Sequence, residues 1–227
     1  MTKFKFRRRW DSYSKVRHFL SRVRRNRRFQ LKTPKVEASR YLDIGCGDNI
    51  NEGLINLDYM WHPGVDVCWD IRSGLPFEKN RFDGVFSEHC LEHFDLADGE
   101  KLCREVYRIL RPDGRFRVVV PSADLYLKTY FERVEKTSTS EFPYESKEAF
   151  KGEFYTPMLS VNRIFYQDRD SAFGHRCMYD YELMSAILKH VGFTSTLLCQ
   201  FRSGSDNSLL VDSSKRECES LYVEAIK

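Results

Sequence analysis

Short apolar runs alternate with segments of helical periodicity between residues 36 and 227. Such runs, bounded by Gly, Asn, Asp or Pro, are typical of buried strands. Apolar positions three and four apart predict helices near residues 99–110 and 181–190, and residues 111–114 (Arg-Pro-Asp-Gly) predict a turn. Strands that alternate with helices favour a mainly parallel sheet. The predicted strands are Tyr41–Ile44, Leu54–Asp58, Val65–Trp69, Phe82–Ser87, Arg115–Val120, Ser195–Phe201 and Ser220–Ile226.

The N-terminal segment has a different pattern. Residues 1–35 hold 14 Lys and Arg and one acid, whereas the rest of the chain holds 23 and 32, so a basic arm of net charge +13 precedes an acidic body of −9. Pro34 marks the predicted boundary between this arm and a single domain over residues 36–227. Within residues 3–30 the apolar residues follow helical spacing: Trp10, Tyr13, Val16, Phe19, Leu20 and Val23.

This arm has three open interpretations. A basic amphipathic helix can lie on an anionic membrane surface. It can also contact the phosphates of nucleic acid, which we consider the weaker of these two interpretations. In the third, the apolar stripe packs on the acidic body or on a second subunit, and the oligomeric state stays open.

Composition narrows the class of protein. A chain of 227 residues with 41% hydrophobic residues is expected to form one soluble domain with an appendage. No apolar run is long enough to cross a bilayer, and the basic N-terminus lacks the apolar core of a secretory signal. Seven scattered cysteines without a CxxC pair indicate neither a disulfide framework nor a zinc site. We therefore expect a cytoplasmic protein, with peripheral contact to the inner membrane surface through residues 3–30 as an option.

The most informative stretch is the end of the first predicted strand. Asp43 precedes a Gly-x-Gly turn formed by Gly45, Cys46 and Gly47. Glycine lets a backbone turn sharply and lets a ligand approach it closely. In open α/β sheets ligands bind at the carboxyl ends of the strands. The turn therefore predicts a small-molecule site.

Two further strands end near an acid. Asp58 ends the second strand, where a carboxylate can accept hydrogen bonds from both ribose hydroxyls of a nucleoside. Asp70, followed by the apolar Ile71, ends the third and is suited to an adenine edge and face. Asp is also common in turns and helix caps, which is the alternative for each acid alone. Only ten residues separate Gly47 from Asp58, too few for the helix of a dinucleotide site, and no phosphate-binding Lys-Ser/Thr pair is present.

Taken together, these residues resemble class I S-adenosylmethionine-dependent methyltransferases, closest to the small type 11 branch with a shortened first helix. The resemblance covers about residues 38–121 and, more weakly, 174–226. It is carried by the ordered motifs Asp43-Ile-Gly-Cys-Gly47, Asn56-Leu-Asp58, Asp70-Ile71, Leu75-Pro76-Phe77, Phe82-Asp83-Gly-Val-Phe-Ser87, Leu91-Glu92-His93 and Leu110-Arg-Pro-Asp-Gly114.

The resemblance implies a Rossmann-like α/β fold with a seven-stranded, mainly parallel sheet, its last strand antiparallel, and helices on both faces. It implies S-adenosylmethionine as cofactor and S-adenosylhomocysteine as product. The Gly45–Gly47 loop, with Cys46, would pass the methionine moiety, which Asp43 would contact directly or through water. The remaining implied contacts are Asp58 to the ribose, Asp70 and Ile71 to the adenine, and Ser87 and Glu88 near the sulfonium.

A dense polar cluster follows the fourth predicted strand. His89 and His93 lie four residues apart and would share one face of a helix, a spacing that metal sites use. The zinc-protease order His-Glu-x-x-His is absent, however, so we predict no metal site here. Cys90 is more consistent with a buried thiol than with a nucleophile. We predict that His89 faces the substrate as a candidate general base.

Residues 122–175 are a long segment with eleven aromatic residues, which predicts an ordered substrate lid. A satellite apolar core under a loop is the alternative, and the two are compatible. In similar proteins a histidine followed by Tyr-Asp precedes the last helix on the substrate side. His175 is thus a second candidate base, with a structural histidine beside an Asp180 N-cap as the alternative.

We therefore expect a methyltransferase that acts on a small-molecule, sugar or lipid-linked acceptor, because the lid is aromatic and the body acidic. Two alternatives stay open. One is an RNA methyltransferase that uses the basic arm, and the other is a methyltransferase-like protein that binds partners without catalysis.

Overall fold

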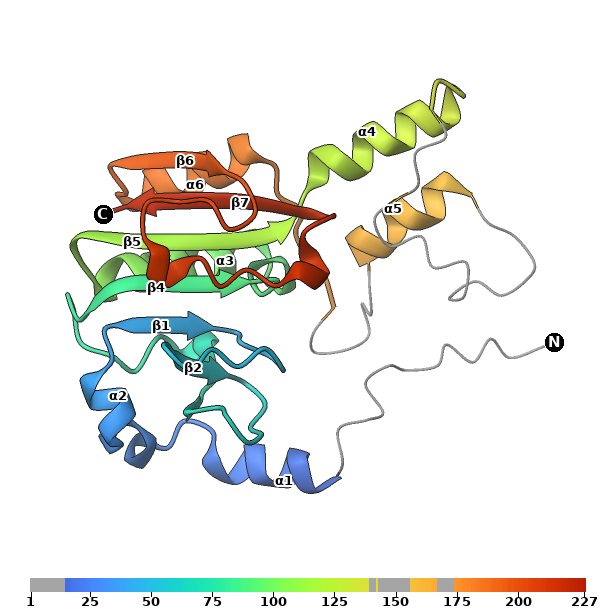
Figure 1. Ribbon diagram of the computed structural model, residues 1–227. Coiled ribbons are helices and arrows are strands. Elements are labelled where there is room, and N and C mark those ends of the chain that lie inside the picture. The colour runs from blue at the N-terminus through green and yellow to red at the C-terminus, as the bar shows by residue number, and fades with distance from the viewer. Residues whose placement is uncertain (1–14, 139–141, 143–155, 167–173) are drawn as a thin grey trace.

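The computed structural model describes residues 15–138, 142, 156–166 and 174–227, and a seven-stranded sheet forms its centre (Figure 1). The strand order is β3-β2-β1-β4-β5-β7-β6, and β7 runs antiparallel to both of its neighbours. The predicted Rossmann-like class is confirmed, since β1 to β5 pair in parallel. The strands are β1 Tyr41–Ile44, β2 Ile55–Asp58, β3 Val67–Cys68, β4 Phe82–Glu88, β5 Leu110–Pro121, β6 Ser195–Cys199 and β7 Ser220–Ile226.

The helices begin at residues that satisfy their first amide groups. Asp95 caps α3 and Asp180 caps α6, each accepting from the amide three residues on. The Asp180 cap is the one proposed from the sequence. The α-helices are α1 Lys15–Arg24, α2 Pro34–Ala38, α3 Leu96–Ile109, α4 Ala123–Val134, α5 Pro157–Tyr166 and α6 Tyr181–Val191.

The prediction that residues 111–114 form a turn before the fifth strand is wrong, because this segment lies inside β5. Leu110 already pairs with Phe82, and the register then shifts so that Arg115 pairs with Gly84. Asp113 takes a left-handed φ of 62° within the shifted segment. Leu110 is fully buried, and the burial of this apolar side chain beside β4 favours extending the strand back to it.

The two faces of the sheet are covered differently. Helices α3 and α6 pack on one face and enclose the main apolar core, with Val85, Val106 and Leu188 fully buried (Figure 1). The 3-10 helix η5 (Asn207–Leu209) covers β4 on the other face. There the buried Arg117 of β5 forms a two-pronged ion pair with Asp212, at 2.7 and 2.5 Å, which holds the 200–213 segment against the sheet.

The arm packs on the body through its polar face. Ser21 is fully buried on α1 and accepts a hydrogen bond from the Trp61 amide, and Arg25 donates to the Tyr59 carbonyl. Apolar residues of the predicted stripe point outward: Val16 and Phe19 are each 64% exposed. The interpretation in which this stripe packs on the body is therefore wrong for the part of the arm that the structure describes. Trp10 and Tyr13 lie outside the described residues.

The described parts of the predicted lid form two helices, α4 and α5, beyond the carboxyl ends of β4 and β5 (Figure 1). They enclose a small apolar cluster of their own around Tyr126, Phe142, Val161 and Ile164. Residues 139–141, 143–155 and 167–173 of the segment lie outside the described residues. The satellite core is thus present, and the lid remains a prediction.

None of the seven cysteines, which all lie among the described residues, forms a disulfide. Among the described helices, none combines the length and apolar character that crossing a bilayer requires.

Candidate functional site

A cavity of about 250 Å³ opens at the carboxyl edge of the sheet, between the segments that follow β1 to β4. Five of the predicted cofactor residues line it: Gly45, Gly47, Asp58, Asp70 and Ile71. Four others do not: Asp43, Cys46, Ser87 and Glu88. Residues that follow β1, β2 and β3 therefore line one cavity, because the carboxyl ends of these parallel strands lie at the same edge of the sheet.

The two glycines of the turn are required for different reasons. Both have left-handed φ angles, 74° at Gly45 and 53° at Gly47. A Cβ at Gly45 would lie 2.4 Å from the Cys90 Sγ, so the turn packs directly against the end of β4. A Cβ at Gly47 would meet no atom within 4 Å. Gly47 therefore leaves its backbone open to a ligand, whereas Gly45 allows the close packing that positions the loop.

Asp58 ties the first two strand ends together. One carboxylate oxygen accepts from the Gly47 amide at 2.9 Å and the other from the Met60 amide at 2.7 Å. Burial raises the pKa of this carboxyl group, and the two amide hydrogen bonds offset part of the effect. Each oxygen keeps a second lone pair that can accept a ribose hydroxyl, so the side chain fits its predicted role.

The carboxylate of Asp70 is already engaged by another side chain, so it is less available to a ligand than the sequence predicts. Arg72 donates to both of its oxygens, at 2.8 and 2.7 Å, and this pairing lowers the pKa of Asp70. Around it, Tyr59 and Trp69 contribute aromatic surface to the cavity beside Ile71. Neither aromatic residue was predicted to line the site from the sequence, although each is adjacent in the chain to an acid that was, Asp58 or Asp70.

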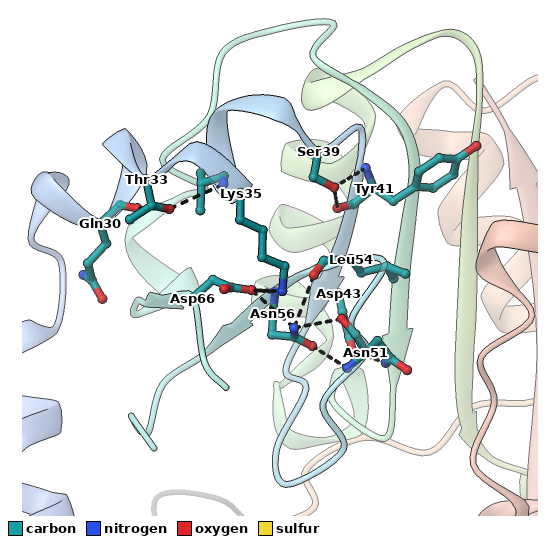
Figure 2. Close-up of polar contacts among 11 residues, drawn as sticks. Gln30, Thr33, Lys35, Ser39, Tyr41, Asp43, Asn51, Leu54, Asn56 and Asp66 are labelled. Atoms are coloured by element: carbon teal, nitrogen blue, oxygen red, sulfur yellow. Dashed lines mark hydrogen bonds and ion pairs between the residues drawn. The ribbon is translucent and has the colours of Figure 1, made fainter. Parts of the chain in front are cut away.

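Asp43 lies behind the loop in a buried polar network (Figure 2). Its carboxylate accepts from the Asn51 side chain at 2.7 Å. The fully buried Asn56 of β2 then accepts from the Asn51 amide and donates to Asp66, which also binds Lys35 of α2 at 2.7 Å. This chain of hydrogen bonds fixes residues 48–54 against the sheet. Apart from the polar residues themselves, no motif predicts this network.

The acids around the loop repel one another. Burial raises the pKa of Asp43 to about 8, and the neighbouring carboxylates of Glu88 and Asp58 add to the rise. Glu88 faces away from the cavity and accepts from the Ser213 amide at 2.9 Å. Ser87 is buried and donates to the Ile44 carbonyl. Ser87 and Glu88 therefore bind neighbouring segments and do not line the cavity.

The histidines gather around Glu92 of the 3-10 helix η4 (Leu91–His93). Nδ1 of His89 lies 3.4 Å from a Glu92 oxygen, and the Nε2 atoms of His93 and His175 lie 3.9 and 4.0 Å from the same oxygen. His89 and His93 line the cavity, whereas His175 does not. Of the two predicted bases, His89 thus reaches the cavity and His175 stands behind Glu92.

His89 is held firmly in place. It has a left-handed φ of 48°, and its Nε2 lies 2.8 Å from the Ser220 hydroxyl. That hydroxyl donates its proton to the Arg216 carbonyl, so it accepts from His89 Nε2. Nδ1 then points towards Glu92 and Glu219, the latter at 3.8 Å. The ring orientation is therefore set by groups outside the cavity.

The arm also reaches the glycine loop. Arg17 of α1 forms an ion pair with Asp48 at 3.0 Å, directly after Gly47. His62, in the segment that follows β2, contacts the Gly47 carbonyl at 2.6 Å. The loop is thus held from both the arm and the segment that follows β2.

Comparisons with known proteins agree with this arrangement. Residues 50–118 match the model of a family described as a methyltransferase domain. A segment of 63 residues, 28% of the chain, is 38% identical to phosphoethanolamine N-methyltransferase 2 of Caenorhabditis elegans. That match spans 13% of the length of the curated relative.

Of two similar solved structures, the first, at a TM-score of 0.50, shares the fold. A methyltransferase of Thermotoga maritima, described as a possible histamine N-methyltransferase, aligns over 93% of this chain and 94% of its own, with 16% identity and a TM-score of 0.50. The 1,6-didemethyltoxoflavin-N1-methyltransferase of Burkholderia thailandensis, solved with S-adenosylhomocysteine, aligns over 96% and 80%, with 18% identity and a TM-score of 0.46.

The raised pKa of Asp43 predicts a pH dependence of stability. The folded state holds this proton up to about pH 8, whereas the unfolded chain releases it near 3.8, so the Asp43 contribution to the free energy of unfolding falls between those values. The substitution Asp43→Asn removes the titration. We expect the variant to gain stability over the wild type as pH rises from 4 to 8, by at most about 1.4 kcal/mol per pH unit.

Urea unfolding at a series of pH values measures this difference. The exposed Asp113 offers the control substitution Asp113→Asn, which should leave the pH profile of the wild type unchanged. A stability difference between Asp43→Asn and wild type that stays constant from pH 4 to 8 would contradict the assignment.

Proposed function

We propose that this chain, a class I methyltransferase by its domain match and fold, transfers a methyl group from S-adenosylmethionine to a small-molecule acceptor. The observation that carries the proposal is the convergence of Gly47, Asp58 and Ile71 on one cavity at the carboxyl edge of the sheet. Each of these groups suits a different part of a nucleoside sulfonium. An acidic, glycine-lined space also favours a cation over a phosphate.

The residues present fit such a cofactor. The open side of Gly47 allows a ligand against the backbone, and the free lone pairs of Asp58 suit ribose hydroxyls. Ile71, Trp69 and Tyr59 offer apolar and aromatic surface for a purine. Asp70 would serve the adenine amino group through an oxygen that already binds Arg72.

In methyl transfer the main task of the protein is to position the cofactor and the acceptor relative to each other. When bound, S-adenosylmethionine supplies a methyl group that leaves sulfur for a nucleophile, while the electron pair of the broken bond stays on sulfur. The chain's own residues hold the two partners in line and keep water out, which is the main source of rate in such a transfer. The carboxyl groups of Asp43, Asp58 and Glu88 lie near the loop, and a cationic reactant beside them would favour their charged forms.

A hydroxyl acceptor would need its proton removed, and a neutral amine would need less help. His89 is the predicted base that lines the cavity, and one of its ring nitrogens would have to leave Ser220 or Glu92 to accept a proton from the acceptor. His175 stands behind Glu92, and we therefore favour His89 for contact with the acceptor.

The acceptor is best described as a small polar molecule. The C. elegans relative is named for phosphoethanolamine, and the acidic residues Asp95 and Asp98 also line the cavity, where they would attract an amine. Sugar and lipid-linked acceptors remain within this proposal. RNA methylation and binding without catalysis are the alternatives that the assays must separate.

For the arm we propose peripheral contact with an anionic membrane. Val16, Phe19, Val23 and Phe29 are more than half exposed on a segment that also carries Arg22, Arg27 and Arg28. Apolar side chains beside arginines suit the boundary between acyl chains and anionic headgroups. The ion pair between Arg17 and Asp48 would place the glycine loop close to that surface.

Calorimetry with S-adenosylmethionine tests the cofactor assignment. We expect one molecule to bind per chain, and the substitution Asp58→Ala to weaken binding at least about 100-fold, because two hydrogen bonds to a charged group are lost. Asp113→Asn serves as the control and should bind like the wild type. Absent binding by the wild type, or undiminished binding by Asp58→Ala, contradicts the proposal.

Turnover is then followed with a labelled methyl group on phosphoethanolamine, sugars, lipids and RNA. Transfer to a small acceptor supports the proposal. Transfer only to RNA, with steeply salt-dependent binding, would favour the nucleic-acid alternative.

Vesicle sedimentation tests the arm. The wild type should bind vesicles that contain phosphatidylserine and release them as salt rises, and Phe19→Ser should bind several-fold less. Leu198 of β6 is similarly exposed, at 61%, and Leu198→Ser is the matched control. Equal binding by both variants and the wild type would count against the membrane contact.

A further inference from the structure

We propose that Glu92, His93 and His175 form a binding site for one divalent transition-metal ion, next to the cofactor cavity. The cluster joins two distant parts of the chain, because η4 follows β4 and His175 precedes α6. Their ligand atoms all lie within 4.8 Å of one another. The proposal concerns metal binding alone and does not depend on methyl transfer.

The first observation is a buried carboxylate that has histidine neighbours but no hydrogen bond. Glu92 is 1% exposed, and His89, His93 and His175 lie 3.4–4.0 Å from one of its oxygens. Neither oxygen accepts a hydrogen bond from a described residue. A buried carboxylate without a hydrogen bond is costly, and such groups commonly hold a cation. The buried Nδ1 of His93 likewise has no hydrogen-bond partner among the described residues.

The second observation is the orientation of His175. Its Nδ1 lies 2.9 Å from the Ile164 carbonyl, and a carbonyl can only accept, so Nδ1 carries the proton. In the neutral ring Nε2 then presents a lone pair towards Glu92, 4.0 Å away. Metal-binding histidines commonly hold their second nitrogen in this way, because the hydrogen bond fixes both tautomer and ring direction.

The distances between the three candidate ligands are slightly longer than those in an occupied metal site. In a tetrahedral zinc site two N or O ligands lie roughly 3.4 Å apart. The Nε2 atoms of His93 and His175 stand 3.9 and 4.0 Å from the Glu92 oxygen, so small side-chain rotations would bring each pair into range. The two rings meet edge to face, with centroids 4.9 Å apart.

The donor set favours borderline metals. Two imidazoles and one carboxylate are typical of Zn²⁺ and of other first-row divalent ions, and less suited to Mg²⁺ or Ca²⁺. His93 lines the cavity and its side chain is 24% exposed, so an ion held here would have an open position on the cavity side. The site would also link η4 to the chain before α6, where the Arg176 amide already donates to the Glu92 carbonyl at 2.7 Å.

Equilibrium dialysis of the full chain, stripped with chelator and exposed to Zn²⁺, tests the proposal by elemental analysis. We expect about one zinc per chain, and at least about 100-fold weaker binding for His175→Gln and for Glu92→Gln, because each loses a ligand. His190 of α6 is the matched control, since its side chain is 69% exposed and lies outside the cluster. His190→Gln should bind like the wild type.

Less than about a tenth of an equivalent on the wild type would overturn the proposal, as would unchanged zinc binding by His175→Gln. If a variant fails to fold by circular dichroism, the visible spectrum of the Co²⁺-loaded wild type decides. Bands typical of nitrogen and oxygen ligands support the site. A thiolate charge-transfer band would place the ion on one of the seven free cysteines and overturn it.

Discussion

The hydrogen bond from the Gly47 amide to the Asp58 carboxylate is the contact on which the candidate site depends. It joins the turn after β1 to the end of β2, and so places the open backbone of the turn beside a carboxylate. The bond forms only because both glycines take left-handed φ angles and Gly45 has no side chain to collide with Cys90. Asn51, Asn56 and Arg17 then hold the same loop from outside the cavity.

The second constraint is charge. Asp43, Asp58 and Glu88 are brought close together at one sheet edge, and burial raises the pKa of each. Such an arrangement lowers the stability of the folded protein as pH rises, because each buried carboxyl group must either keep its proton or carry a charge in a medium of low polarity. A bound cation would favour the charged forms of these groups. The electrostatics of the loop would therefore add to the preference for a sulfonium ligand, beyond the direct contacts that line the cavity.

The sequence predicted the parts of the fold that depend on neighbours along the chain. The bounds of β1 and β7 follow from apolar runs, and the lining of the cavity by Asp58 and Ile71 follows from their position at strand ends. Contacts between distant segments could not be predicted in this way. The Asn56–Asp66 hydrogen bond, the Arg72 partner of Asp70 and the convergence of His175 on Glu92 arise only once the chain folds. The arm is a further example. Its amphipathic pattern predicts a helix with an apolar and a polar face. The hydrogen bonds of Ser21 and Arg25 to the body then determine that the polar face packs on it.

A crystal structure with S-adenosylhomocysteine would most directly test the assignment of this cavity to the cofactor. We expect the ribose hydroxyls to lie within hydrogen-bonding distance of both Asp58 oxygens, with the purine between Ile71 and Tyr59 and the thioether arm over Gly47. A ligand bound elsewhere on the chain, or a ribose that makes no contact with Asp58, would contradict it.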